Sequence, residues 1–386
     1  MERCRGITWN HPRGYCALEA ASLIWQGRGL EIQWERQSLE DFESRGIEEL
    51  SGLYDLMVID HPHVGQAAAS GCLHPLESWL ALGELMELDQ KTVGPVLLSY
   101  CYSGRHWALP LDAATQVAAF RPDLIPKAVS LPSSWQEVLE WPDQLILPLA
   151  GPHPLLAFFS ICVALDEPPL SKNPSTLVST ETGEQALDVL IRLYKRMDPV
   201  ALTLNPIALL DRMATTNAVP YCPLVYGYTN YATAGGVDGH PLFFTNAPVF
   251  SPHRRPGSTL GGTGVAVSRR TKITPSLNAY LHWLVAPSTQ ADFIPSHAGQ
   301  PCLRAAWQDD GVNARSNRFY LDTLNTMEHS WVRPRSPGYI EFQSAGATAI
   351  RSGLLQGDLP STIFARLTCI AQKSVARNEH VASASD

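Results

Sequence analysis

The first sixty residues alternate between short apolar runs and longer stretches that mix apolar and polar side chains. Strands are expected over residues 5–10 and 30–34, the second because apolar and polar positions alternate along it. Helices are expected over 17–25 and over the acidic stretch 39–50. The run 54–60 is apolar but ends in polar residues, as a buried parallel strand does when its end faces a cleft. This succession predicts an α/β fold built on βαβ units.

The remainder of the chain continues this mixed pattern. A pair of short helices is expected over 73–88, and strands are expected over 107–110 and 116–120, on either side of a turn at 112–115. Another strand is expected over 241–244. Helical patterns also cover the stretches 134–141, 154–165, 183–197, 276–286, 317–327 and 342–355.

The composition is that of a well-packed chain with room for two domains. Of its 386 residues, 45% are hydrophobic and 17% are charged. The net charge of −8 argues against a nucleic-acid partner, which needs dense Lys and Arg on one face. The longest apolar stretch, 155–165, is shorter than the roughly 20 residues that cross a bilayer, so we expect no membrane insertion.

No motif in the sequence points to a bound metal or organic cofactor. The eight cysteines are scattered without CxxC or zinc-like spacing, so we expect free buried thiols, which suit a reducing compartment. The glycine cluster at 261–264 is neither a dinucleotide fingerprint nor a P-loop. No GxSxG or HExxH motif is present either. We therefore expect neither a metal nor a cofactor.

The first residues carry no recognisable export signal. Residues 1–6 lack the basic start, the apolar core and the small-residue cleavage site of a secretory leader. We expect a cytoplasmic protein if the sequence is used as written. If a leader has been removed, a periplasmic or extracellular protein is expected instead.

Five segments together carry a resemblance to a known family. They are RGITWNHPRGY at 5–15, YDLMVIDHP at 54–62, WALPLDAATQVAAFRPDL at 107–124, GGTGVAVS at 261–268 and GQPCLRAAW at 299–307. In this order along the chain they resemble the extracellular solute-binding proteins of ABC transporters, family 1 or carbohydrate type. The resemblance implies a two-lobed, type II periplasmic-binding-protein-like fold, with hinge crossovers and a central ligand cleft.

The same resemblance implies where the chain passes between the lobes. The expected crossings are the segments 109–112 and 260–264. The lobes are expected to divide the chain as follows: lobe 1 comprises 1–112 and about 261–310, lobe 2 comprises about 113–260 and about 311–375, and 376–386 form a flexible tail.

Two loops, after the first and the third strand, are expected to face the cleft. Trp9 either stacks on an apolar sugar face or plugs the edge of its lobe, and His11 follows it. Asp60, His61 and His63 either line the cleft or cap and hydrogen-bond the local backbone. A metal would need a further ligand beside the two histidines, and the sequence offers none at a recognisable spacing.

Four further candidates lie at or near the expected crossings. Asp112 and Gln116 are placed to hydrogen-bond ligand hydroxyls, although Asp112 could instead satisfy backbone amides of the expected turn. Thr263 and Gln300 belong to glycine-containing segments, whose backbone can approach a ligand closely.

A tyrosine-rich segment supplies the last candidates. Residues 221–231 hold four tyrosines and an amide, and buried phenols need hydrogen-bond partners. We assign Tyr226, Tyr228 and Tyr231 to the ligand site, with packing among aromatic side chains as the alternative. His153, at the start of an apolar helix, either reaches the cleft from the second lobe or simply ends a loop.

The sequence leaves two functions open, and each has a small molecule as partner. In the first, the protein captures a polar or ring-bearing ligand by hinge closure, with an ABC permease as a further partner if it is exported. In the second, a cytoplasmic enzyme without metal performs a cyclase, isomerase or lyase-type reaction in the closed cleft, with His61, His63 and Asp60 as acid–base groups. We favour binding, because no recognised catalytic set is present.

Overall fold

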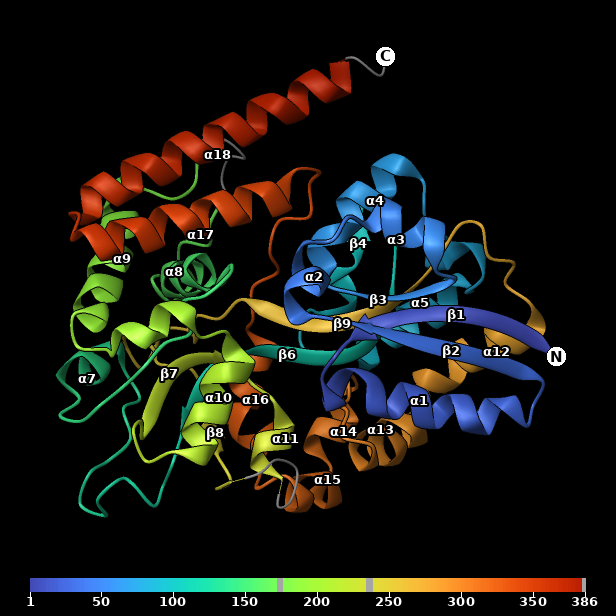
Figure 1. Ribbon diagram of the computed structural model, residues 1–386, viewed down its shortest axis with the longest axis horizontal. Coiled ribbons are helices and arrows are strands. Elements are labelled where there is room, and N and C mark those ends of the chain that lie inside the picture. The colour runs from blue at the N-terminus through green and yellow to red at the C-terminus, as the bar shows by residue number, and fades with distance from the viewer. Residues whose placement is uncertain (172–175, 234–238, 384–386) are drawn as a thin grey trace.

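The molecule has two lobes that lie side by side and share one continuous sheet (Figure 1). The computed structural model describes residues 1–171, 176–233 and 239–383, with side chains up to residue 374. The N-terminus lies at the far end of one lobe, and the C-terminal helix lies across the other. The sequence predicted this two-lobed α/β fold.

The first lobe is built on parallel strands. β1 (Glu2–Trp9) pairs in parallel with β2 (Leu30–Gln37) on one side and with β3 (Leu56–Ile59) on the other, as the βαβ pattern predicted. Parallel pairing brings the carboxyl ends of these strands to one edge of the sheet. The helices on this side are α1 (Pro12–Gln26), α2 (Leu39–Ser44), α3 (Ile47–Leu53), α4 (Val64–Ser70), α5 (Leu82–Lys91), α6 (Val96–Ser99), α12 (Pro275–Leu284), α13 (Ile294–Ser296), α14 (Arg304–Gln308) and α15 (Asp310–Arg315). A hairpin of β4 (Cys101–Tyr102) and β5 (Arg105–His106) also lies here. Three short helical turns complete this side: η1 (His61–His63), η2 (Leu76–Ser78) and η4 (Thr289–Phe293).

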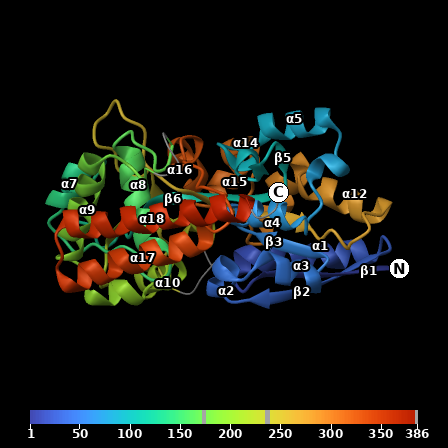
Figure 2. The same ribbon diagram turned by 90° about the horizontal axis from the view of Figure 1, so that it is seen from above.

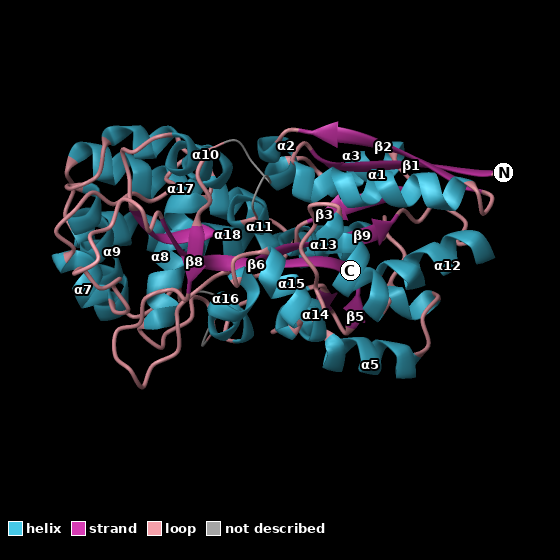
Figure 3. Ribbon diagram, turned by 90° about the horizontal axis from the view of Figure 1, so that it is seen from below, coloured by secondary structure: helices cyan, strands magenta, loops and turns pink. Residues whose placement is uncertain are grey.

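Two long strands carry the sheet from one lobe into the other. The first half of β6 (Leu109–Phe120) pairs with β9 (Leu260–Val267), and its second half pairs with β7 (Tyr221–Tyr226) and β8 (Phe243–Thr245). β9 also pairs with β3, and Figure 3 shows β6 reaching toward β8. The turn expected at 112–115 was wrong. β6 is buried along almost its whole length, so its sequence lacks the polar alternation of a half-exposed strand. Its pairing with β7 and its pairing with β9 each contain one irregularity.

The second lobe packs its helices around α8 (His153–Ala164), all of whose residues are buried. A helix that is apolar on every side needs such a position inside a core. α9 (Thr180–Tyr194) and α17 (Tyr339–Gln356) pack against it (Figure 2). The other helices are α7 (Trp135–Glu140), α10 (Pro206–Thr215), α11 (Thr229–Ala232), α16 (Phe319–Glu328) and α18 (Pro360–Ser383), with the turn η3 (Pro199–Thr203).

The C-terminal helix α18 runs into the segment 376–386, for which the sequence predicted a flexible tail. The backbone continues α18 as far as Ser383, and α18 packs along α17. Residues 384–386 lie outside the described residues. Helical hydrogen bonding within α18 needs no apolar sequence, which is why a polar stretch can continue it.

Two further expectations concerned the state of the cysteines and the presence of a membrane-spanning segment. All eight cysteines are free thiols, and Cys4, Cys162, Cys222 and Cys302 are buried. Within the described ranges, none of the helices combines the length and the apolar character that a bilayer crossing requires.

Candidate functional site

A small cavity lies where the two lobes meet. Trp9 and Asp60 reach it from the carboxyl ends of β1 and β3, and Glu43 reaches it from α2. Tyr226 lines it from the end of β7 in the second lobe, and Arg333 lines it from the segment between α16 and α17. Ligands of α/β proteins bind at such strand ends. The remaining lining residues are Arg13, Leu39, Phe42, Ala114, Leu156, Tyr228, Gly261, Gly262 and Thr263.

Arg13 on α1 and Asp112 on β6 form a buried ion pair beside the cavity. Arg13 Nε donates to Asp112 Oδ2 at 2.7 Å, and both side chains are only 4% exposed. Asp112 Oδ1 accepts the backbone N–H of Thr263 at 2.7 Å. Arg13 also donates to the Gly227 carbonyl at 3.4 Å, and its guanidinium lies 4.6 Å from the centre of the Tyr228 ring. The pair therefore ties α1 to both crossing strands.

A second ion pair, Arg333 with Asp60, borders the cavity directly. Arg333 Nη2 donates to Asp60 Oδ2 at 2.5 Å, and Nη1 donates to Gln343 Oε1 at 3.2 Å. Burial opposes the ionisation of Asp60, but the Arg333 guanidinium and the His61 ring outweigh it and hold the pKa of Asp60 below its usual range. Asp60 in turn raises the pKa of Arg333, although burial acts against the charge. Both partners are therefore charged at neutral pH.

Glu43 and His153 face each other across the cleft. Glu43 Oε1 lies 3.7 Å from His153 Nε2, which is beyond hydrogen-bond distance. Burial and the nearby charge of Asp60 raise the pKa of Glu43 to about 8. Burial and the positive charge of Arg333 lower the pKa of His153 to about 3. At neutral pH both side chains are therefore mainly uncharged.

Aromatic side chains form another wall of the cavity. The Trp9 ring packs against Phe42, with ring centroids 5.2 Å apart. The Tyr226 hydroxyl lies 3.2 Å from Thr259 Oγ1. Burial raises the pKa of Tyr226 and of Tyr228, so both phenols stay protonated. Such rings offer flat apolar faces beside hydrogen-bonding groups.

Two buried polar groups at the cavity, Trp9 Nε1 and Thr263 Oγ1, have no hydrogen-bond partner among the described residues. Trp9 is 2% exposed and Thr263 is 3% exposed. A buried polar group left without a partner costs about 1–3 kcal/mol. A molecule with hydroxyl groups could supply the missing partners.

The cavity is small in this arrangement of the lobes. Its volume is about 50 Å³, which holds only a few water molecules. Small-molecule sites occupy roughly 300–1,000 Å³. A ligand of sugar size therefore needs the lobes to move apart, and the shared strands β6 and β9 allow this because they are the links about which a hinge can bend.

Five of the predicted site residues line this cavity: Trp9, Asp60, Tyr226, Tyr228 and Thr263. Asp60 also caps the turn η1, as the local alternative proposed, by accepting the backbone N–H of His61 at 2.8 Å. The two interpretations of Asp60 are thus compatible.

The histidines predicted for the cleft are not among the described residues that line this cavity. His11 caps α1, where its Nδ1 accepts the backbone N–H of Arg13 at 3.2 Å. His61 is fully buried, with Nδ1 3.1 Å from Asp60 Oδ1, and His63 is buried as well. Burial lowers the pKa of all three rings, that of His61 to about 4. The proposed acid–base set therefore does not share one open space.

Asp112 and Gln116 belong to the crossing strand β6 and are not among the described residues that line this cavity. Asp112 is occupied by Arg13 and by the backbone of β9. Gln116 Oε1 accepts hydrogen bonds from Ser160 Oγ at 2.5 Å and from Thr259 Oγ1 at 2.8 Å. Both side chains therefore hold the crossing strands in place.

Tyr231 and Gln300 likewise make structural contacts away from the cavity lining. The Tyr231 hydroxyl donates to Asp211 Oδ1 at 2.7 Å. Gln300 accepts the backbone N–H of Thr229 at 2.8 Å and donates to the Ala113 carbonyl at 2.9 Å. Only part of the tyrosine-rich segment therefore reaches the cavity.

Sequence reasoning missed Arg13, Glu43 and Arg333. Arg13 lies in the segment 5–15 that was singled out, four residues after Trp9, and its position in the first turn of a helix was the available signal. Glu43 is one of several acidic residues of its helix, and Arg333 lies in an irregular segment without periodicity. Across the described ranges, His, Cys, Asp and Glu form no group of three that could hold a metal ion.

Comparison with known proteins identifies the fold. No family model and no curated protein matches the sequence. A solute-binding protein of an ABC transporter from Agrobacterium radiobacter K84, in complex with ribitol, matches with a TM-score of 0.81 and 20% identity, over 96% of this chain and 98% of that one. One from Thermotoga lettingae TMO, bound with α-D-tagatose, matches with a TM-score of 0.82 and 15% identity, over 97% and 100% of the two chains. UgpB from Mycobacterium tuberculosis, in complex with glycerophosphocholine, matches with a TM-score of 0.77 and 17% identity, over 98% and 99%.

These matches extend over nearly the whole of each chain, while the sequences have diverged to 20% identity or less. At such identities the likeness concerns architecture and not the ligand. The chain therefore has the two-lobed α/β fold of the solute-binding proteins of ABC transporters.

Proposed function

We propose that the protein captures a small, hydroxyl-rich or ring-bearing molecule between its lobes by hinge closure. The observation that carries this proposal is the pair of buried, unpartnered groups on Trp9 and Thr263, in a cavity bounded by both lobes. A polyol or a monosaccharide offers many hydroxyls that both donate and accept hydrogen bonds. Ribitol, α-D-tagatose and D-mannitol are bound by three structural neighbours, which supports this ligand class.

Closure in this proposal is a rotation of one lobe against the other. We propose that one lobe comprises 1–112 and about 261–310, and the other about 113–260 and about 311–375, with β6 and β9 between them. The further partner proposed is an ABC permease, with the protein acting where that permease collects its solute.

A thermal-unfolding panel tests the proposed ligand class. Ribitol, D-tagatose, D-mannitol and maltose are each added at millimolar concentration, and a true ligand at one hundred times its Kd stabilises the native state by about 2.7 kcal/mol. Calorimetric titration of the best compound is expected to give one site per chain. The proposal fails if none of the four raises the melting temperature and none releases or absorbs heat on titration.

A further inference from the structure

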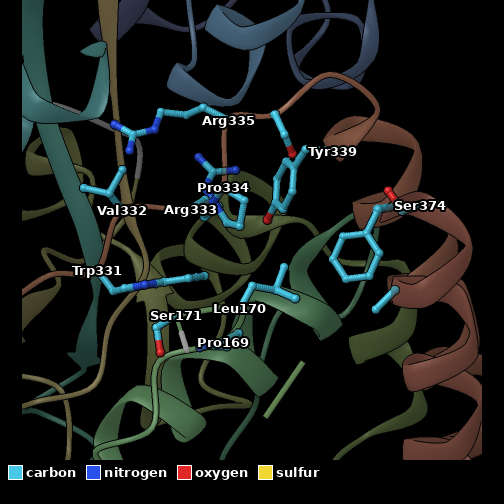
Figure 4. A pocket seen from close by; sticks show the side chains of 13 residues that line it. Pro169, Leu170, Ser171, Trp331, Val332, Arg333, Pro334, Arg335, Tyr339 and Ser374 are labelled. Atoms are coloured by element: carbon cyan, nitrogen blue, oxygen red, sulfur yellow. The ribbon is translucent and has the colours of Figure 1, made fainter. Parts of the chain in front are cut away.

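A second pocket lies beside the segment 331–336, which leads from α16 toward α17 and which we call the strap (Figure 4). Its volume is about 540 Å³, within the range of roughly 300–1,000 Å³ that is usual for small-molecule sites. Arg333 is the one lining residue that it shares with the cleft cavity. The other walls come from the loop 169–171, from the start of α17 and from α18. We call this the strap pocket.

The walls of the strap pocket are mainly apolar. Trp331 is fixed beside β9, because its backbone N–H donates to the Ser258 carbonyl at 2.8 Å and its carbonyl accepts from Leu260 at 2.8 Å. Tyr339 and Phe342, on the first turns of α17, lie with their ring centroids 5.9 Å apart. A molecule with an aromatic or other apolar body therefore finds rings on two sides of the pocket.

Two hydrogen-bond donors in the strap pocket lack a partner among the described residues. They are the Tyr339 hydroxyl and Arg333 Nε, and each of these side chains is only 3% exposed. Figure 4 shows the Tyr339 hydroxyl directed toward the space between Leu170 and Arg333. Both groups can donate to the same acceptor on a bound molecule. The apolar walls of the pocket offer them no such acceptor.

The charges around the pocket favour an anion. Arg333 and Arg335 both line it, and no Asp or Glu is among its described lining residues. Asp60 already balances the charge of Arg333, so the positive charge that favours an anion is that of Arg335. Arg335 donates to the Leu98 carbonyl at 2.5 Å, so its positive charge is not neutralised by that contact. Hydrogen bonds between charged partners are roughly twice as strong as those between neutral ones.

We propose that the strap pocket binds a small organic carboxylate with an aromatic or other apolar body. The body packs against Trp331 and Phe342, and the carboxylate accepts hydrogen bonds from Tyr339 and Arg333. The strap pocket and the cleft cavity share Arg333, and their other described lining residues differ.

Calorimetric titration with two matched probes tests the proposal on the full chain. The probes are 4-phenylbutyrate and the uncharged 4-phenylbutan-1-ol, which share the ring and the chain length. We expect the carboxylate to bind at one site per chain and the alcohol to bind about tenfold more weakly. Absence of any binding of 4-phenylbutyrate at millimolar concentration, or equal affinity for the two probes, overturns the proposal.

Four variants place the binding in the strap pocket. Tyr339→Phe removes the donor but keeps the ring, so affinity for 4-phenylbutyrate falls about 2- to 10-fold, while the melting temperature stays or rises because an unpartnered hydroxyl is lost. Ser374→Trp fills the pocket and abolishes binding, whereas Gln372→Trp, at an exposed position of the same helix, retains it. Trp9→Phe, in the cleft, also retains it. The proposal is contradicted if Ser374→Trp binds like the parent protein or if Trp9→Phe loses the probe.

Discussion

Two buried Arg–Asp pairs flank the cleft, and they differ in how completely the protein surrounds them. In the pair of Arg13 and Asp112, both side chains are 4% exposed, and both carboxylate oxygens accept hydrogen bonds from the protein. In the pair of Arg333 and Asp60, both carboxylate oxygens also accept hydrogen bonds, but the carboxylate is 14% exposed and borders the cavity. Arg333 Nε has no partner within the described part of the chain. The same residue types thus form a fixed brace in one place and a group open to bound molecules in the other. The exposure of the carboxylate and the unpartnered Arg333 Nε, and not the charge pair itself, distinguish the two pairs.

The largest expected effect is the loss of stability when the buried ion pair of Arg13 and Asp112 is broken. Arg13→Met leaves the Asp112 carboxylate buried without a counter-charge, which we expect to lower the free energy of unfolding by about 3–5 kcal/mol. Unfolding in urea measures this change. Because the double variant Arg13→Met/Asp112→Asn no longer buries a lone charge, it should recover part of the loss. If Arg13→Met unfolds at the same urea concentration as the parent protein, the ion pair does not stabilise the fold.

The second pair should affect stability less and binding more. Asp60 keeps some contact with water, so Arg333→Met is expected to cost about 1–3 kcal/mol of stability. The variant also leaves a negative charge beside the cleft, and we expect the affinity for the cleft ligand to fall about tenfold or more. Urea unfolding and calorimetric titration measure the two effects. A stability loss larger than that of Arg13→Met would reverse the comparison.

Ligand affinity should depend on pH through Glu43 and His153, because the present arrangement of the lobes buries His153 and most of the Glu43 side chain. Burial raises the pKa of Glu43 from its ordinary 4.5 to about 8. Closure therefore takes up a proton at any pH between these two values, and ligand affinity falls as the pH rises toward 8. The pKa of His153 falls from 6.5 to about 3, so closure expels a proton, and affinity falls as the pH drops below 6.5. Between pH 4.5 and 6.5 the two effects oppose each other. Affinity should therefore be greatest there and decline on both sides, by at most about tenfold per pH unit.

A variant at Glu43 separates the contributions of Glu43 and His153 to this pH profile. Glu43→Gln cannot ionise, so its affinity is expected to stay level between pH 6.5 and 8, where that of the parent protein declines. The nearest charges, Asp60 and Arg333, do not change over this range, because each holds the other in its charged form. Titrations at several pH values measure both proteins. If the two decline together above pH 6.5, another group controls closure.

The sequence predicts those parts of the molecule that local pattern determines. Alternating and continuous apolar runs located β1, β2 and β3, and the polar residues that end these strands led to Trp9 and Asp60. β6 was misread as two strands and a turn, because pairing on both sides buries it and removes the alternation.

Tertiary contacts determine the parts that the sequence did not predict. His11 and His61 looked like cleft residues by position, but one caps a helix and the other packs inside the core. Arg333 meets Asp60 across 273 residues of chain, and no local pattern can indicate a partner at that separation. The candidate site was therefore predictable at its strand ends and not in its charge pairs.

We propose that a ligand is held between the lobes by groups that the protein itself leaves without partners. Calorimetric titration of the parent protein and of Trp9→Phe, in parallel and with the best compound of the thermal panel, tests it most directly. Trp9→Phe removes the unpartnered Nε1 donor and keeps an aromatic ring in its place. We predict saturable binding at one site in the parent protein, and affinity about 2- to 10-fold weaker in the variant. Equal affinity in the two proteins, or no saturable binding in either, would contradict the account.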